Sequence, residues 1–519
     1  MSDPRAAGAG SGGWRFGMAL AAVVATAAKL AAFHHVLSFA YADTYKTVAG
    51  GTACLAVAIL WWWLLAGFGR FGAVAAWFAQ SLYLAVCWSY FSYFGLHLTL
   101  ATVLSVGGEG ATAVGFGAIP LAWGMLWLLV DLPFVLWREG LPAMRLRWAP
   151  LPLALLIALF AAQTVRADRA LRWAENERDD RYTGQALFVL EFGLLPIQIR
   201  QAWRGPGQRA LEYGPEVALR ASADERRDVL IVQVESLDVG AIESSMPRLA
   251  ARAAQGVWYP RCLAYHGPGG SSDCDVAVIE GAEPLWDAVA FDQPQFTWPN
   301  SWVARLRAAG WNATLAHGLP GAYFNFAQVM PRLGYELLDI ERLGLTQHPG
   351  EFGARDDELV DAVLGRLPAL ASPYVLHVVT MTSHQPFVQH KGWWKGPVTG
   401  DDYRDSMACV DAQLDRLIAG FLAHSPQGLV VLFGDHAAAL PTSDIERSGG
   451  SQREYVPLLF LGTGEAPRRD PRPASFLDVG RTMLPAAGWS GSWRTWGADL
   501  LPAGGTLPPT WHHGRELPR

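Results

Sequence analysis

Five long apolar segments occupy the N-terminal part of this chain, and they limit what it can fold into more than any other feature. Each is about long enough to cross a lipid bilayer, which takes roughly 17–25 residues. The segments lie near residues 16–40, 50–68, 72–96, 115–137 and 149–165. Because more apolar segments follow the first one directly, it is not a cleavable signal peptide. The sequence therefore predicts a transmembrane domain of five helices over residues 1–165.

Basic residues in the short connections predict the orientation of this domain. Arginines precede the first segment and lie between the second and third and between the fourth and fifth; these are Arg5, Arg15, Arg70, Arg138, Arg145 and Arg147. The other two connections carry Asp43, Lys46 and Glu109. The positive-inside rule then places the N-terminus in the cytoplasm and everything after about residue 166 outside it. We expect a multi-pass protein of the cell (inner) membrane with a periplasmic or extracellular polar half.

Lys29, His34 and His35 lie inside the first apolar segment. A charged group within a membrane span is a functional-site hypothesis by default. For Lys29 the alternatives are snorkelling to the interface or binding a lipid headgroup.

Residues 166–227 are polar, and we predict a juxtamembrane helical linker. Within it, residues 186–203 are apolar but interrupted by Glu191, Gly193 and Pro196. We expect this segment to lie at the membrane interface. A sixth span is the alternative, and it would place the following domain in the cytoplasm.

The composition agrees with a membrane protein. Hydrophobic residues make up 51% and charged residues 17% of the chain, which is too apolar for a wholly soluble protein. The net charge of −6 argues against a nucleic-acid partner. The cysteines show no zinc-binding spacing, although a disulfide between Cys262 and Cys274 fits an oxidising compartment.

From Asp228 onward, short β-branched apolar runs alternate with amphipathic helical stretches. This alternation is typical of buried strands in a mostly parallel sheet with crossover helices. We predict an α/β domain over residues 228–505, followed by a tail over residues 506–519.

Polar side chains follow four of the predicted strands, where each strand ends. Glu235 follows the first, His317 the second and His384 the third, and Asp435 and His436 follow the fourth. Ligands of open α/β sheets sit beyond the carboxyl ends of the strands. Each residue alone also fits a structural role, such as a capped turn or a loop histidine, but together they predict a site at this edge.

A glycine-rich loop leads into Ser271, Ser272 and Asp273. Glycine and proline let the backbone approach a ligand closely. A hydroxyl at a helix start lies beside free N–H groups and the positive end of the helix dipole, which suits a phosphate. An ordinary capped loop is the alternative for this stretch on its own.

Two carboxylates, an imidazole and a hydroxyl suit a divalent ion such as Mn²⁺, Mg²⁺ or Zn²⁺. A metal bound to a serine oxygen lowers the pKa of the hydroxyl and makes it a nucleophile near neutral pH. The same ion neutralises charge on a phosphoryl oxygen.

Four motifs carry a resemblance to a known family. They are Val234-Glu235-Ser236, Gly270-Ser271-Ser272-Asp273, Thr382-Ser383-His384-Gln385-Pro386-Phe387 and Phe433-Gly434-Asp435-His436. In order and spacing they resemble those of the lipoteichoic acid synthase type of membrane phosphotransferase, within the sulfatase and alkaline phosphatase superfamily.

The resemblance implies roles for individual residues. It implies that Glu235, Ser271, Asp435 and His436 bind one metal ion, most often Mn²⁺, and that Ser271 is also the nucleophile. It implies that His384 contacts the substrate phosphate. His317 is similar to a further family histidine near the site.

The chain departs from the family pattern at three places. Serine at position 271 replaces the usual threonine but keeps the hydroxyl. The Cys/Ser-x-Pro-x-Arg motif of soluble sulfatases is absent there, which argues against formylglycine chemistry. Phe324 and Phe326 occupy the places of the tryptophan and arginine that bind glycerol phosphate in the synthases.

Other residues are candidates for the missing headgroup contacts. Arg332, Lys391 and Lys395 are cations that can compensate for the lost arginine. Trp393, with Trp394, lies shortly after His384 and can meet a headgroup or the membrane interface, with an exposed loop as the alternative. We include Phe324 and Trp393 among the predicted substrate-binding residues.

The resemblance implies transfer of a phospholipid headgroup through a covalent intermediate on Ser271. Phosphatidylglycerol is the expected donor, and the acceptor is an envelope glycan or lipid. A phosphoethanolamine transferase, a headgroup-releasing phosphodiesterase and a non-enzymatic envelope binding protein are the alternatives.

Overall fold

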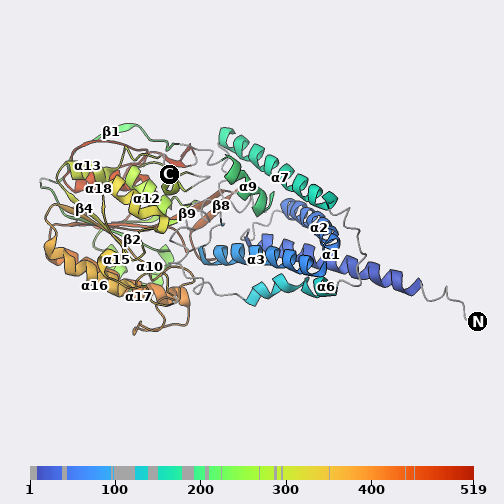
Figure 1. The fold of residues 1–519 in the computed structure, drawn as a ribbon. Coiled ribbons are helices and arrows are strands. Elements are labelled where there is room, and N and C mark those ends of the chain that lie inside the picture. The colour runs from blue at the N-terminus through green and yellow to red at the C-terminus, as the bar shows by residue number, and fades with distance from the viewer. Residues whose placement is uncertain are drawn as a thin grey trace, which may run out of the picture. The chain divides into compact units, whose positions relative to one another are not determined.

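The computed structural model describes residues 9–37, 44–94, 98, 123–137, 150–177, 192–204, 210–223, 225–267, 269–285, 289–293, 296–349, 351–438, 440–448, 451–512 and 514–519 (Figure 1). The chain divides into two compact units. The first lies within residues 1–104 and 119–205, and the second takes in residues 206–519.

Helices make up the described part of the first unit. They are α1 (Ala9–Leu37), α2 (Thr44–Gly67), α3 (Arg70–Phe94), the 3-10 helix η1 (Trp123–Leu129), α6 (Leu132–Leu136), α7 (Pro150–Glu177) and α9 (Leu194–Arg204). Each of the five predicted apolar segments contains one or two of these helices, although parts of four segments lie outside the described residues.

Three of these helices are long and apolar enough to cross a membrane. Their spanning stretches are Phe16–Leu37, Arg70–Phe91 and Pro150–Ala170. Shorter apolar helices cover Gly51–Gly67 and Met125–Leu136. The N-terminal unit therefore has the helices of a membrane domain, while the number of five crossings stays a prediction.

A buried ion pair connects α1 to the start of α6. Lys29 Nζ lies 3.0 Å from Asp131 Oδ1 and donates to Ser81 Oγ at 2.9 Å. Asp131 also accepts hydrogen bonds from Thr26 Oγ1 and Trp77 Nε1, each at 2.8 Å. Both charged side chains are completely buried. Lys29 is thus paired inside the helix bundle and does not snorkel.

The predicted linker region divides between the two units. Helix α7 continues through residues 166–177, and a buried ion pair of 3.4 Å joins its Asp168 to Arg200 of α9. Strand β1 (Glu216–Leu219) pairs with β12 (Gly491–Arg494) of the second unit. Residues 178–191 lie outside the described residues, so the placement of residues 186–203 at an interface stays a prediction.

The second unit is built around a 10-stranded sheet of order β10-β3-β9-β7-β2-β6-β4-β5, with β11 beside β3 and β8 beside β9. Its strands are β2 (Val229–Val234), β3 (Val257–Ala264), β4 (Asn312–His317), β5 (Glu336–Leu338), β6 (Tyr374–Val379), β7 (Leu429–Gly434), β8 (Ile445–Ser448), β9 (Ser451–Leu461), β10 (Arg468–Arg469) and β11 (Ala474–Ser475). Strands β7, β2, β6, β4 and β5 run parallel, and β9 is antiparallel to both of its neighbours β7 and β3. The predicted mostly parallel α/β fold is confirmed.

Helices cover both faces of this sheet (Figure 1). Alternate side chains of a strand enter different cores: Val229 and Ile231 pack on one face, and Leu230 and Val232 pack on the other. The first face is covered by α12 (Ser271–Glu280), α13 (Trp302–Ala308), α14 (Phe326–Leu333) and α18 (Leu477–Ala486). The second is covered by α10 (Val239–Ser245), α11 (Pro247–Ala253), α15 (Ile340–Leu343), α16 (Asp356–Arg366) and α17 (Asp402–His424). A continuous apolar strand such as β2 is therefore buried on both sides.

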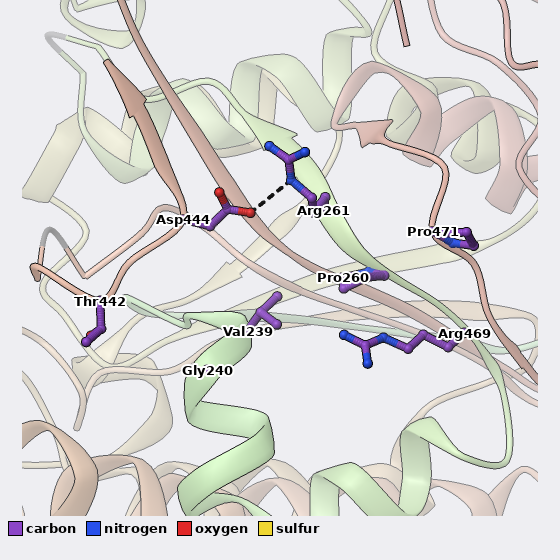
Figure 2. Close-up of a pocket in the computed structure, with 8 residues that line it drawn as sticks. All are labelled: Val239, Gly240, Pro260, Arg261, Thr442, Asp444, Arg469 and Pro471. Carbon is purple, nitrogen blue, oxygen red and sulfur yellow. Dashed lines mark hydrogen bonds and ion pairs between the residues drawn. The ribbon is translucent and has the colours of Figure 1, made fainter.

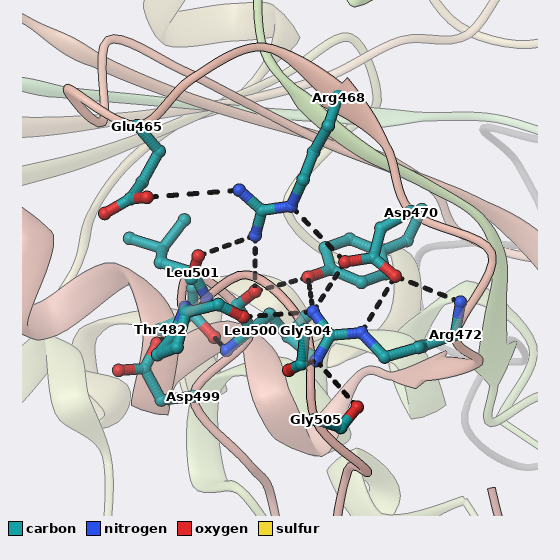
Figure 3. Close-up of polar contacts among 12 residues, drawn as sticks. Glu465, Arg468, Asp470, Arg472, Thr482, Asp499, Leu500, Leu501, Gly504 and Gly505 are labelled. Atoms are coloured by element: carbon teal, nitrogen blue, oxygen red, sulfur yellow. Dashed lines mark hydrogen bonds and ion pairs between the residues drawn. The ribbon is translucent and has the colours of Figure 1, made fainter.

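The C-terminal segment is tied to the domain by arginines (Figure 3). Arg468 donates to the carbonyls of Leu500 and Leu501, and Arg472 donates to the carbonyl of Gly504. Asp470 lies between the two guanidinium groups, 3.3 Å from Arg468 and 2.5 Å from Arg472.

Residues 506–519, which the sequence sets apart as a tail, contain the hairpin β13 (Thr510–His512) and β14 (Arg515–Leu517). Arg519 makes a buried, two-point contact with Asp478 of α18. These residues pack as part of the second unit.

Candidate functional site

Strand register brings the two predicted carboxylates together. Val234 and Gly434 are paired residues at the ends of the parallel strands β2 and β7. The next residue on each strand is Glu235 and Asp435, so both carboxylates leave the sheet at the same edge. The main-chain N–H of Asp435 donates to the Val234 carbonyl at 3.1 Å, which continues the ladder to the point where the side chains diverge.

Glu235, Asp435 and His436 form a compact donor cluster. One ligand atom from each lies within 4.8 Å of the others. His436 Nε2 lies 3.3 Å from Glu235 Oε1 and 3.6 Å from Asp435 Oδ2. All three side chains are largely buried, with His436 the most exposed at 16%.

Ser236 forms hydrogen bonds to both carboxylates of this cluster. Its hydroxyl donates to Glu235 Oε1 at 2.7 Å, and its main-chain N–H donates to Asp435 Oδ1 at 2.9 Å. Its φ of 54° is unusual for a residue that is not glycine. Such backbone strain persists where the surroundings fix it, and it is concentrated at functional sites.

The charges of the cluster shift one another's protonation. Burial disfavours the ionised form of Glu235, but His436 and His384 outweigh it and lower the pKa of this carboxyl. Burial and the neighbouring Glu235 charge raise the pKa of Asp435. Burial opposes the charged imidazole, yet Asp435 and Glu235 raise the pKa of His436 well above its ordinary value. Two carboxylates against one imidazole leave the cluster short of positive charge.

The donor set fits a divalent cation. Carboxylate oxygens and an imidazole nitrogen are the usual ligands of Zn²⁺ and Mn²⁺. Asp435 Oδ2 is buried and accepts no hydrogen bond from any residue that the structure describes. An unsatisfied buried acceptor of this kind is costly unless it binds an ion or water. Glu235, Asp435 and His436 are therefore residues that can hold the metal.

Ser271 is the first residue of α12, and a tight loop leads into it. Gly270 has a φ of 55°, and a side chain at Gly269 would collide with Asp273 at 2.2 Å. Asp273 Oδ2 accepts the N–H groups of Gly267 and Gly269, and Ser272 Oγ donates to the Gly269 carbonyl at 2.7 Å. Ser272 and Asp273 thus stabilise the loop that leads into Ser271.

The Ser271 side chain lies beside Asp435. It is among the neighbours that favour the ionised carboxyl, against the larger effect of burial, which raises the pKa of Asp435. The predicted nucleophile therefore lies near a strand-end carboxylate, although the two come from loops far apart in sequence.

Two further histidines border the cluster. His384 Nδ1 lies 2.7 Å from the Gln385 carbonyl, and its ring packs on Phe352 with centroids 4.0 Å apart. Burial lowers the pKa of His384, while Glu235 acts against this shift. His317 ends β4, and burial lowers its pKa to about 4 despite the nearby Glu235 and Asp339. Strand β6 pairs in parallel with both β2 and β4, so the histidines that follow β4 and β6 lie at the same sheet edge as Glu235.

Phe324 and Phe326 stand where the family pattern has the tryptophan and arginine for the headgroup. Phe326 packs on His317 with centroids 5.1 Å apart, and Phe324 packs on Phe326 at 6.2 Å. Phe324 has a φ of 46°, inside the short 3-10 helix η6 (Tyr323–Asn325). Arg332 donates to the Phe296 carbonyl, and Lys391 pairs with Asp402 at 2.6 Å. Two of the proposed compensating cations are thus engaged elsewhere.

Trp393 lies on the segment after His384. Its indole N–H donates to the Gln389 carbonyl at 2.5 Å, and the Arg355 guanidinium lies 5.7 Å from its ring. Neither contact belongs to the donor cluster.

Cys262 and Cys274 are buried free thiols, so the disulfide considered for an oxidising compartment is not formed.

Two residues beside the cluster, His266 and Glu454, were not predicted from the sequence. The His266 ring stacks on His436 with centroids 4.3 Å apart, and its Nδ1 lies 3.2 Å from both Glu454 oxygens. The position of His266 directly before the glycine-rich loop was a usable signal. Glu454 lies within strand β9 and carries no motif.

A separate surface pocket of about 520 Å³ lies beside α10 (Figure 2). It is lined by Val239, Gly240, Pro260, Arg261, Thr442, Asp444, Arg469 and Pro471. Arg261 pairs with Asp444 at 2.9 Å, and Arg469 pairs with Glu243 at 3.0 Å. Because both arginines already face carboxylates, the pocket has no surplus positive charge for an anion.

Known proteins share the second unit. The family profile described as Sulfatase matches residues 227–489. The chain is 21% identical to lipoteichoic acid synthase 1 of Bacillus subtilis (strain 168) over 257 residues, which is 45% of this chain and 40% of that protein. It is 30% identical to the capsular polysaccharide biosynthesis protein RkpI of Rhizobium meliloti (strain 1021) over 148 residues, or 27% of this chain and 26% of that protein.

Among solved structures, the lipoteichoic acid synthase LtaP from Listeria monocytogenes is similar with a TM-score of 0.45 and 17% identity. That similarity covers 55% of this chain and 79% of the LtaP chain. The chain spans less than half the length of the two curated relatives it matches.

Proposed function

This chain belongs to the sulfatase family through a domain related to lipoteichoic acid synthase, and from this premise we propose that it is a membrane-anchored, metal-dependent phosphotransferase. It moves a phospholipid headgroup onto an envelope glycan or lipid. Phosphatidylglycerol is the proposed donor, and the transferred group is phosphoglycerol.

One observation carries this proposal. The Glu235, Asp435 and His436 ligand atoms lie within 4.8 Å of one another at the ends of adjacent strands. Ser271 is the first residue of α12, and its side chain lies beside Asp435. A nucleophile beside an anionic, metal-binding cluster supports chemistry at phosphorus better than binding alone.

The proposed reaction has two steps. Ser271 Oγ loses its proton and forms a bond to the phosphorus of the donor lipid. The bond from phosphorus to the diacylglycerol oxygen breaks, and this oxygen takes up a proton. An acceptor hydroxyl then attacks the same phosphorus and releases Ser271. His384 holds a phosphate oxygen, and the positive end of the α12 helix dipole favours the negative charge.

Glu235, Ser271, Asp435 and His436 would hold the ion. When bound, a divalent metal lowers the pKa of the serine hydroxyl and offsets charge on the phosphoryl oxygens. We propose Mn²⁺ as the native ion, with Mg²⁺ and Zn²⁺ as alternatives. His317, Phe324 and Trp393 complete the proposed substrate-binding set.

We propose that residues 1–165 form the membrane domain with five crossings, and residues 166–227 the linker. Residues 228–505 then form the catalytic domain outside the cytoplasm, in the periplasm or extracellular space. The helices of membrane-spanning length in the N-terminal unit support this arrangement. A lipid donor is then within reach of a domain held at the membrane.

The proposal is tested with full-length protein in detergent, with Mn²⁺ and phosphatidylglycerol labelled in its headgroup. We expect diacylglycerol release and label transfer to an added glycan or lipid acceptor. Label found only as free glycerol phosphate indicates a phosphodiesterase. No turnover of any phospholipid, together with intact folding and metal binding, would favour a binding protein and overturn the proposal.

Phosphatidylethanolamine is the second candidate donor. Phe324 and Phe326 stand where the synthases have the tryptophan and arginine of their glycerol phosphate site, and Arg332 is committed to the Phe296 carbonyl. The same assay with labelled phosphatidylethanolamine separates the two donors. Faster turnover of this lipid would make the protein a phosphoethanolamine transferase.

A further inference from the structure

His266, Glu454 and His436 form a second polar cluster against the proposed metal centre. Both Glu454 oxygens lie 3.2 Å from His266 Nδ1, and the main-chain N–H of Ala437 donates to Glu454 Oε2 at 3.1 Å. The imidazole rings of His266 and His436 lie face to face, with centroids 4.3 Å apart and planes 11° apart.

The fold brings these residues together through β9. This strand pairs with β3, which leads into His266, and with β7, which leads into His436. Glu454 pairs in register with Ala264, two residues before His266. It is only 5% exposed, whereas His266 is 19% exposed. A buried carboxylate on the strand between them therefore contacts both the His266 ring and the backbone after His436.

A second metal ion is the first explanation to consider. The three residues offer ligand atoms within 4.8 Å of one another, and two histidines with one glutamate form the ligand set of known zinc enzymes.

The ring geometry argues against this explanation. An imidazole binds a metal through a nitrogen lone pair that lies in the ring plane. Two rings that are 4.3 Å apart and nearly parallel direct their lone pairs along separate planes, so they do not converge on one ion. His436 Nε2 also faces Glu235 at 3.3 Å, which commits this nitrogen to the first cluster.

We propose instead that His266 and Glu454 are positioning residues for His436. His266 lies flat on one face of the His436 ring, and Glu454 fixes both the His266 ring and the Ala437 N–H. His436 Nδ1 lies 3.0 Å from the Ala437 carbonyl, so Ala437 also fixes the orientation of the ring. Together these contacts aim Nε2 at Glu235 and Asp435. The inference rests on the proposed function, because it assumes a metal ion at that cluster.

Residues that orient a metal-binding histidine typically affect metal affinity by about 10–100-fold. The proposed role of His266 depends on a flat ring that stacks on His436. The proposed role of Glu454 depends on a side-chain oxygen that contacts His266 and accepts from the Ala437 N–H. A phenylalanine at position 266 keeps the stacked ring, whereas an alanine removes it. Glu454→Gln keeps one acceptor oxygen of similar shape.

The test measures binding of Mn²⁺ alone to full-length protein in detergent, by electron paramagnetic resonance and titration calorimetry. We expect one ion in the wild type, a dissociation constant raised about 10–100-fold in His266→Ala, and recovery of most of the affinity in His266→Phe. Glu454→Gln should fall between these variants. His348→Ala is the matched control, because His348 also pairs with a glutamate, Glu358 at 2.8 Å, and should bind Mn²⁺ as the wild type does.

Several outcomes would overturn the positioning role. They are unchanged affinity in both His266→Ala and Glu454→Gln, equal loss in His266→Phe and His266→Ala, or two ions in the wild type with one lost in His266→Ala. If His266→Ala does not fold, His266→Phe and Glu454→Gln still decide the question. Absence of any Mn²⁺ binding in the wild type refutes the metal centre, and the positioning role with it. Normal Mn²⁺ binding without lipid turnover refutes only the proposed reaction, because no lipid enters this test.

Discussion

His436 Nε2 lies 3.3 Å from Glu235 Oε1, although the two residues are separated by most of the second unit in sequence. The contact exists because β2 and β7 are neighbours in the sheet and end in register. With Asp435, the pair makes a buried site that is richer in negative than in positive charge. A divalent cation bound by these three residues would balance this charge.

Replacement of the nucleophile should abolish the reaction. Ser271→Ala is expected to lower turnover of the donor lipid at least about 10³-fold, because the covalent step loses its attacking oxygen. The measurement is diacylglycerol release by purified full-length protein. Ser244→Ala is the matched control: Ser244 is an exposed serine of α10 whose hydroxyl donates to the Gly240 carbonyl, and its loss should leave turnover unchanged. Equal activity of Ser271→Ala and wild type would refute the mechanism.

Replacement of the candidate metal ligand Asp435 should remove the stabilisation of the folded protein by Mn²⁺. A ligand present at 100 times its dissociation constant stabilises a folded protein by about 2.7 kcal/mol. We expect Mn²⁺ to raise the unfolding temperature of the wild type and to have little effect on Asp435→Asn. Thermal unfolding with and without Mn²⁺ measures this difference. A metal-dependent shift of the same size in the variant would exclude Asp435 as a ligand.

The Asp470 carboxylate should stabilise the domain in a pH-dependent way. Burial opposes ionisation of Asp470, but hydrogen bonds from Arg472 and Arg468 outweigh burial and lower its pKa to about 2. A folded-state pKa below the ordinary value means that the stabilisation is complete above about pH 4 and disappears as the pH falls toward 2.

Asp470→Asn tests this dependence. We expect the variant to unfold at lower urea concentration than the wild type at pH 7, and the difference to shrink between about pH 4 and pH 2. Urea unfolding followed by tryptophan fluorescence gives the measurement. A difference that stays constant over this range would show that the ion pairs are not its source.

The buried pair of Lys29 and Asp131 should be structural. Removing one partner of a buried ion pair typically costs about 3–5 kcal/mol, because the other charge is left unpaired. Lys29→Met should therefore lower the stability of the detergent-solubilised protein. Adding Asp131→Asn should recover a large part of the loss, since the remaining group is neutral but still accepts from Thr26 or Trp77.

Thermal stability and lipid turnover of the single and double variants decide between two roles. A double variant that is both stable and active supports a structural pair. A double variant that is stable but inactive would assign Lys29 a function in the membrane domain instead.

Sequence patterns located the candidate ligands Glu235 and Asp435 but not their arrangement. The runs before Glu235 and Asp435 predicted strands that end at one sheet edge, and this was confirmed. Their adjacency could not be predicted, because the order β7-β2-β6-β4 is set by crossovers between distant segments. Glu454 was missed for the same reason: it faces the cluster only because β9 pairs antiparallel with both β3 and β7.

Burial explains two other differences between sequence and structure. Lys29 has no carboxylate within its own apolar segment, and its partner Asp131 comes from a later one. Cys262 and Cys274 were close enough in sequence to suggest a disulfide, yet both are packed as thiols in the core. Whether Lys29 finds a partner, or the two cysteines form a disulfide, depends on which helix or strand packs against each side chain.

The central claim is a covalent intermediate on Ser271, and the most direct measurement is to trap it. Full-length protein is mixed briefly with headgroup-labelled phosphatidylglycerol and Mn²⁺, denatured in acid and digested, and the labelled peptide is identified by mass spectrometry. The account predicts label on Ser271 in the presence of Mn²⁺, and none after chelation or in Ser271→Ala. Turnover without any labelled protein, or label on a different residue, would contradict it.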